Sequence, residues 1–310
     1  LVGCGDGIDL PGVNVETDLN KIPLPDNNVN LEQVELKPST EPMLHEGLHT
    51  EEDFQRIRDK KAAGEEPWVS AYQLLVESQF SQKTADTYPT EWIKRGISGD
   101  ENYMNAARGA TIVYQQALRW KIEQDDEYAA KAVENLNKWV QTCVGVTGNT
   151  NLSLAAGLYG YEFAIAGELL RDYGGWDRAD FAAFQNWLLK VFYPANDDFL
   201  KRHHDTNALH YWANWCLCNI AAKMAIGIVT DRRDIYNEGI AHLQTGDTNG
   251  RLRRAIYHDY APDYNFAQWQ ESGRDQGHTL MCVGLMGIIC QLAWSQGDDF
   301  FAYDDNLFLR

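Results

Sequence analysis

The sequence predicts an all-α fold, and three observations lead to that prediction. Apolar residues recur at helical spacing in long segments, short breaks containing Gly, Asp or Asn separate these segments, and no alternation of period two persists over the length of a strand. A first helix should begin at Thr50, an N-cap residue followed by acidic residues, and end near Gly64. Further helices are expected near residues 68–82, 101–124, 127–143, 151–173, 178–193, 206–230, 233–244 and 271–296.

Two of these segments, 220–228 and 280–293, are apolar on nearly every side, which indicates helices of an inner layer covered by other helices. Antiparallel helix pairs with an inner and an outer ring form an α/α toroid. The number and length of the predicted helices fit that architecture better than a four-helix bundle. We therefore predict a single-domain α/α toroid, complete or incomplete, over residues 43–310. Residues 1–42 should form an extended arm or tether.

Composition narrows the function classes. The 310 residues carry a net charge of −18, which argues against a nucleic-acid partner, because such a partner requires a basic face. The six cysteines form no CxxC pair, and most lie in apolar helical patterns, so we expect buried free thiols in a monomer. The opening residues, Leu1 to Cys4, look like a bacterial lipobox. They predict a lipid anchor at Cys4 and a secreted, periplasmic or outer-surface lipoprotein.

The first candidate constellation is Asn207, His210 and Asn214. If a helix begins at Thr206, these residues share one face. Three polar groups on an inner helix indicate either a buried hydrogen-bond network or a site, and we favour a site. The neighbouring Trp212 offers a ring on which a sugar can stack.

The second constellation is Glu271, Arg274, Asp275 and His278, which would share one face at the start of the most apolar helix. Such a stripe is costly unless its members are paired or used in a site. An ion network between helices is the structural alternative. A third group, Tyr257, Tyr260 and Tyr264, surrounds a predicted loop, where a tyrosine is well placed for proton transfer.

These residue types suit β-elimination from a uronate. The carboxylate beside the C5 proton must be neutralised, and Asn207 or Arg274 can do so through hydrogen bonds. His210 can then remove the proton, while Tyr264 protonates the departing glycosidic oxygen. His45 and His49 flank Gly47 without a carboxylate at ligand spacing. We therefore predict no metal site and no required cofactor, and leave assistance by a divalent cation open.

Five sequence strings carry a resemblance to a known family. They are HTEEDF at 49–54, YGYEFA at 159–164, HYWANWCLCN at 210–219, QWQESGRDQGHT at 268–279 and GDDFFAYDDNLFL at 297–309. Together they resemble the alginate-lyase-like α/α toroid enzymes, specifically polysaccharide lyase family 38. The resemblance covers most of the chain from residue 44 onward. It implies that relatives continue beyond Arg310, so part of the barrel wall is expected to be missing.

The resemblance implies a central cleft that acts on β-1,4-linked uronates, with alginate as the first choice of substrate and glucuronan the second. It implies His210 as base and Tyr264 as acid, with Tyr257 and Tyr260 as competing acids. Asn149 or Asn151 would neutralise the carboxylate. Further substrate contacts are expected at His49, Tyr159, Asn207, Trp212, Asn214, Tyr257, Gln268, Gln270, Glu271 and His278.

Two other functions remain open at this point. An inverting glycoside hydrolase on a similar barrel would need two carboxylates about 6.5–9.5 Å apart, for which Glu162, Glu271 and Asp275 are candidates. A non-catalytic glycan-binding surface lipoprotein would use the same aromatic residues and Arg274. The products separate these functions, because only a lyase forms an unsaturated uronate without consuming water.

Overall fold

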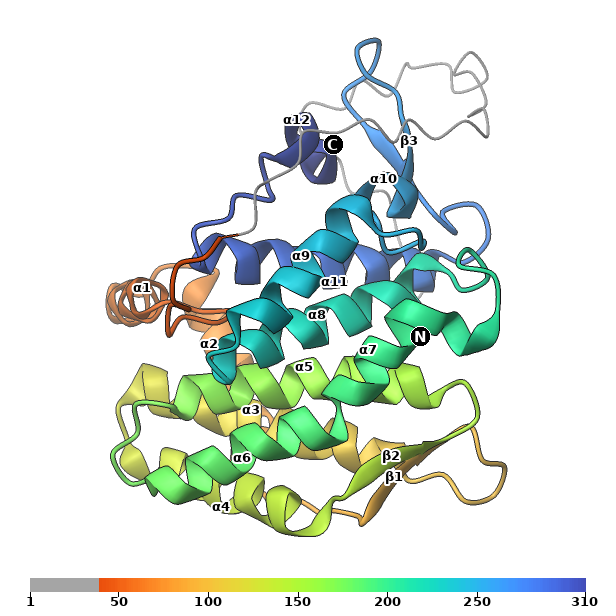
Figure 1. Cartoon of the computed structure of the whole chain (residues 1–310). Coiled ribbons are helices and arrows are strands. Elements are labelled where there is room, and N and C mark those ends of the chain that lie inside the picture. The colour runs from red at the N-terminus through yellow and green to blue at the C-terminus, as the bar shows by residue number, and fades with distance from the viewer. Residues whose placement is uncertain (1–38) are drawn as a thin grey trace.

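The computed structural model describes residues 39–310, and Cys4 with most of the predicted arm lies outside the described residues (Figure 1). The helices confirm the all-α prediction. They are α1 (Glu51–Ala62), α2 (Trp68–Glu77), α3 (Tyr103–Glu123), α4 (Asp126–Thr142), α5 (Leu152–Leu170), α6 (Arg178–Val191), α7 (Tyr193–Arg202), α8 (Ala213–Val229), α9 (Arg233–Thr245), α10 (Leu252–Ala255), α11 (Gln276–Ser295) and α12 (Tyr303–Asn306). The predicted cap of α1 is present, because Thr50 and Asp53 form a capping box.

The helices are arranged as the predicted α/α toroid. α3, α5, α8 and α11 pack side by side as the inner layer, and α4, α6, α7 and α9 lie against their outer side (Figure 1). In α8, every residue from Ala213 to Val229 except Trp215 is buried. α5 and α8 approach so closely at Gly157 that a Cβ there would lie 2.5 Å from the Cys218 Sγ. The described cysteines are free and buried, as expected.

Other helices cover only one face of the inner helix α11. The prediction that helices surround it is therefore wrong for the opposite face. Cys282, Leu285 and Ile289 are buried, but Leu280 is 71% exposed and Met281 39% exposed. By length and composition, α11 is also apolar enough to cross a membrane. Buried core helices of globular proteins pass the same test, so this property distinguishes no function.

Four short strands were not predicted, because three or four residues are too few to show alternation. β1 (Trp92–Arg95) pairs in parallel with β2 (Gly145–Gly148), and β3 (Ile256–Asp259) pairs with β4 (Ala267–Trp269) in an antiparallel hairpin. β1 precedes α3 and β2 precedes α5. Their parallel pairing therefore places the starts of both helices at the same end of the toroid.

The predicted helix over 206–230 begins seven residues late, at Ala213. His203, His204 and Asp205 all have positive φ angles and end α7. The Asn207 Oδ1 then accepts a hydrogen bond of 2.8 Å from the Leu209 backbone N–H. This local bond competes with helix formation and keeps residues 206–212 as a loop.

Candidate active site

All four inner helices begin at one end of the toroid, at the right in Figure 1, and we call it the N-terminal end. β1 and β2 lead into α3 and α5 there, and the loops before α8 and α11 meet beside them. Helix N-termini carry unpaired N–H groups and partial positive charge. Their convergence gives this end a potential that favours an anionic ligand, although the whole chain is acidic.

The loop before α8 presents His210 to solvent on a firmly held backbone. The Asn249 side-chain amide donates hydrogen bonds to the carbonyl of Leu209 at 3.1 Å and to that of Tyr211 at 2.8 Å. The exposed His210 therefore lies between two anchored residues. Its ring lies against the Tyr211 ring, with centroids 4.9 Å apart.

Gln270 connects this loop to the segment before α11. Its Nε2 donates to the Asn249 Oδ1 at 2.9 Å, and its Oε1 accepts from the Ala213 backbone N–H at 3.1 Å. Its side chain also donates to the Arg254 carbonyl at 2.8 Å. The side chain of Gln270 is thus engaged in positioning the loop, so a direct contact with substrate stays a prediction. Gln268 is likewise engaged, with Tyr260 and Ser272.

The predicted stripe of Asn207, His210 and Asn214 on one helical face is wrong, since the first two residues precede α8. Asn207 is exposed in the loop. Asn214 lies in the first turn of α8, is 2% exposed, and its Oδ1 has no hydrogen-bond partner among the described residues. Asn214 therefore belongs to the buried floor below the loop.

The second constellation also lies mostly before its helix, which corrects the predicted single face. Glu271 has a φ of +64°, and Asp275 caps α11 by accepting a hydrogen bond from the His278 backbone N–H. Arg274 pairs with the buried Glu271, and the His278 Nδ1 lies 2.7 Å from the Asp275 Oδ2. Both contacts join residues three positions apart in the same segment, so these four residues do not form the expected ion network between helices.

Arg274 joins the first two constellations. Its guanidinium lies over the Trp212 ring, 5.1 Å from the ring centroid. Both side chains remain exposed. A sugar that stacks on Trp212 would meet Arg274 and the loop of His210 together.

The three tyrosines of the predicted loop lie along the β3–β4 hairpin. Tyr257 belongs to β3 at the base of the hairpin, and the neighbouring Ala255 carbonyl accepts from the Gln270 N–H at 2.9 Å. Tyr264 lies in the connection between the strands, with its ring 5.5 Å from that of Phe266. This connection projects away from the inner helices (Figure 1). Tyr257 is therefore closer to the held loop than Tyr264 is.

Asn149 and Asn151 lie where β2 leads into α5. The Asn149 Oδ1 accepts from the Asn151 backbone N–H at 2.9 Å and from its Nδ2 at 2.8 Å. Gly148 has a φ of +147°, and a Cβ there would lie 1.7 Å from the Arg95 carbonyl oxygen, so only glycine fits. The strand pairing thus brings Asn149 next to Arg95.

The guanidinium of Arg95 has no carboxylate partner among residues 39–310, and its Nη1 is buried without a hydrogen bond. It lies over the Tyr103 ring, 4.7 Å from the centroid, and that ring stacks on Tyr159. Tyr159 is 6% exposed, and burial raises its pKa to about 12, while the charge of Arg95 acts in the opposite direction. Arg95 is an unpaired cation, and a carboxylate ligand would satisfy it.

Known proteins agree with this architecture. The family model for alginate lyase matches residues 57–307. The chain belongs to the alginate lyase family. It is a polysaccharide lyase, as the sequence strings led us to expect.

Solved structures show the same fold for this lyase. A histidine-to-alanine variant of alginate lyase A1-III, complexed with a tetrasaccharide, has a TM-score of 0.62 at 14% identity, covering 85% of this chain and 74% of that one. Alginate lyase A1-III from Sphingomonas species A1 gives 0.57 at 13% identity, covering 85% and 75%. An alginate lyase from Bacteroides ovatus gives 0.55 at 14% identity, covering 83% and 78%. No curated protein matches the chain.

Two residues near the candidate site, Arg95 and His204, were not identified by the sequence analysis. Arg95 follows no motif, and only the unpredicted β1–β2 pairing places it beside Asn149. The His204 Nε2 lies 2.9 Å from the Ser153 Oγ at the start of α5, and the Tyr211 ring contacts both His204 and His210.

The predicted contact residue His49 lies elsewhere in the lyase. Its Nε2 lies 2.5 Å from the Tyr114 hydroxyl in the middle of α3. Burial lowers the pKa of His49, and the nearby Asp53 opposes that effect. Among the described residues, no three His, Cys, Asp or Glu side chains form a metal-ligand group.

Proposed function

We propose that this lyase cleaves a β-1,4-linked uronic-acid polymer, alginate first and glucuronan second, by β-elimination at the N-terminal end of the toroid. The observation that carries the proposal is the exposed His210 on a backbone anchored by Asn249. A general base must be accessible to substrate and held in place, and this arrangement provides both. The unpaired Arg95 at the same end matches the carboxylate that such a substrate brings.

The proposed reaction assigns one group to each proton and charge. Arg95 and the Asn149 amide hydrogen-bond the carboxylate of the sugar and stabilise the charge that develops when C5 loses its proton. His210 removes that proton. The electron pair forms the C4–C5 double bond, the C4–O bond breaks, and Tyr257 protonates the departing glycosidic oxygen. The products are an unsaturated uronate and a shortened polymer, and no water is consumed.

Tyr257 replaces Tyr264 as the proposed acid because of its place in the hairpin. The Gln270 backbone N–H donates to the Ala255 carbonyl at the base of the hairpin, and the Gln270 side chain accepts from the Ala213 N–H at the start of α8. The connection that carries Tyr264 projects away from that point. The matched variants Tyr257→Phe and Tyr264→Phe test this assignment, since only the first should lower kcat.

Two structures of one relative support the choice of residue types. Alginate lyase A1-III was complexed with a tetrasaccharide both as a histidine-to-alanine variant and as a tyrosine-to-phenylalanine variant. A histidine and a tyrosine are also the proton-transfer pair that we propose here. For localisation, we propose a lipid-anchored protein outside the cytoplasm, supported by the lipobox-like sequence at Cys4.

The first experiment follows the ultraviolet absorbance of the unsaturated uronate with polymannuronate, polyguluronate and glucuronan in turn. Rising absorbance on one of them would establish β-elimination and name the substrate. A flat trace with folded protein, together with new reducing ends, would overturn the proposal in favour of a hydrolase. In that case Glu162 would be the first carboxylate to examine, since Glu271 and Asp275 are engaged in ion pairs.

A further inference from the structure

A cavity of about 240 Å³ lies inside the toroid, away from the residues proposed for bond cleavage. It is lined by residues of α3, α5 and α11 and by Leu48, and most of these residues are apolar. The polar groups in its wall come chiefly from Tyr114, Tyr161 and Glu162. Such a largely apolar cavity with a few convergent polar groups is a typical small-ligand site.

Glu162 is the unusual member of this lining. Its Oε2 is buried and has no hydrogen-bond partner among the described residues. The groups that face it are neutral, namely Tyr161 and Tyr159 on its own helix and Tyr114 on α3. On the α11 side the lining residue is Ile288, and no cation lines this cavity. A buried carboxyl oxygen without a partner in such surroundings is costly for stability, which points to a role in binding.

A second cavity, of about 510 Å³, continues the first, and the two share Leu48 and Ile288. Trp68 and His49 contribute to its wall, together with Asp53 and Arg56, which form an ion pair of 2.8 Å with each other. On the α11 side it is bounded by Gly284 and Gly287, and a Cβ added at Gly284 would meet no atom within 4 Å. Glycine inside a helix costs about 1 kcal/mol relative to alanine. Gly284 is exposed, so the groove opens to solvent at this point.

We propose that this interior groove binds a uronate unit of the polymer remote from the cleaved bond, and that Glu162, as a carboxylic acid, donates a hydrogen bond to the carboxylate of that unit. The neutral tyrosines would hydrogen-bond the sugar hydroxyls, and Trp68 would offer a stacking face. The inference rests on the proposed function, since it takes the ligand to be a polyuronate.

The proposed contact requires a proton, because two ionised carboxylates would repel each other at hydrogen-bond distance. Burial raises the pKa of Glu162 to about 7, and the hydrogen bond from Tyr161 opposes that effect. The acid form therefore predominates below neutrality and the ionised form above it. Binding at the groove should weaken about tenfold between pH 6 and pH 8, the change expected when one group with this pKa must be protonated.

The test is calorimetric titration of a mannuronate tetrasaccharide into a His210→Ala background, in which the ligand is not consumed. In this background we expect the affinity to fall about tenfold from pH 6 to pH 8. Glu162→Gln keeps the donor without titrating, so its affinity should change less than about twofold over that range. Glu162→Leu removes the donor and should weaken binding at pH 6. Glu52→Gln, an exposed carboxylate on α1, is the matched control and should retain the full decrease.

Three results would each overturn the inference. They are an equal decrease of affinity from pH 6 to pH 8 in the Glu162→Gln variant, an unchanged affinity in Glu162→Leu, and no binding by folded protein. Circular dichroism confirms that each variant folds. Failure here is distinct from failure of the proposed function. If the lyase forms unsaturated product but its affinity for the tetrasaccharide does not depend on Glu162, only the groove proposal is contradicted. If binding depends on Glu162 but no unsaturated product forms, only β-elimination is contradicted.

Discussion

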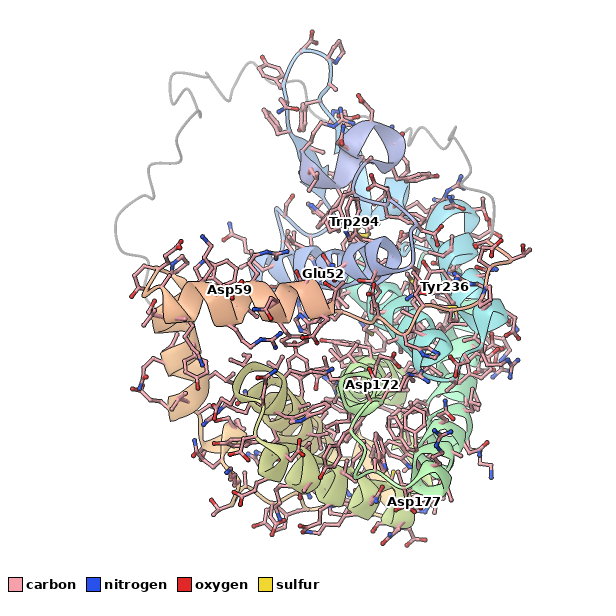
Figure 2. All side chains as sticks on the ribbon, turned by 90° about the vertical axis from the view of Figure 1, so that its left-hand side faces the viewer. Glu52, Asp59, Asp172, Asp177, Tyr236 and Trp294 are labelled. Atoms are coloured by element: carbon pink, nitrogen blue, oxygen red, sulfur yellow. The ribbon has the colours of Figure 1, made fainter. Side chains whose placement is uncertain are left out.

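The arginines at the two ends of the toroid differ in their ion pairing. At the end that faces the viewer in Figure 2, where α5 finishes before Asp172, Arg171 makes hydrogen bonds of 3.0 Å from its Nε to both Glu168 oxygens and lies 3.3 Å from Asp231. Its Nη2 also donates to the Val229 carbonyl at the end of α8, at 2.9 Å. His45 completes this network, 3.0 Å from Asp231.

At the N-terminal end, by contrast, buried polar atoms of Arg95, Asn214, Arg254 and Glu271 lack partners among the described residues. Unsatisfied buried groups are costly, and a folded protein retains few of them. Arg171 therefore stabilises the fold at one end, whereas Arg95, which has no carboxylate partner among the described residues, is available for a ligand at the other. The same residue type, arginine, has a different role at each end.

The largest expected effect is that of His210→Ala, which removes the proposed base. Loss of general-base catalysis should lower kcat about 10²–10⁴-fold with little change in stability. His45→Ala, at the opposite end, is the matched control and should change kcat less than about twofold. Initial rates of unsaturated-product formation measure both. Equal losses in the two variants would remove the functional distinction between the ends.

Arg171→Met should show the reverse pattern. It leaves the buried Glu168 carboxylate without its cation, and breaking such a pair costs about 3–5 kcal/mol. The free energy of unfolding in guanidinium should fall accordingly. The activity per folded molecule should stay near that of the native lyase, because Arg171 touches no proposed site residue. A selective loss of kcat without loss of stability would contradict its structural role.

Arg95→Leu tests whether an unpaired cation at the N-terminal end serves the substrate. A hydrogen bond to a charged group contributes about 1.5–3 kcal/mol, so kcat/KM should fall roughly 10–150-fold. Arg95→Lys keeps the charge but loses the planar fork, and should recover part of the activity. A loss that is the same for Leu and Lys would indicate a packing role against Tyr103 instead.

The sequence was sufficient for the fold and for part of the site. Apolar periodicity located the long helices, and α8 is buried as its composition required. The segments of Trp212 and Arg274, both selected from the sequence as parts of candidate sites, meet in the structure. Periodicity could not show that residues 206–212 form a loop, because the polar residues of this segment are compatible with a helix and with a loop. The hydrogen bonds from Asn249 that hold the loop join residues far apart in the sequence. The place of Arg95 depended on a strand pair too short to predict.

The smallest expected effect concerns the interior groove and the pH dependence of stability. Because the pKa of Glu162 is raised in the folded protein to about 7, the native state holds a proton that the unfolded chain has already released above its ordinary pKa. Stability should therefore decrease as pH rises towards 7 and stay lower above it. Glu162→Gln does not titrate, so relative to the native lyase it should gain about 2 kcal/mol between pH 5 and pH 8. Guanidinium unfolding of both proteins at the two pH values measures this difference, with Glu52→Gln as control. Parallel curves for the native protein and Glu162→Gln would mean that Glu162 is ionised at neutral pH, and the groove would then repel an acidic sugar.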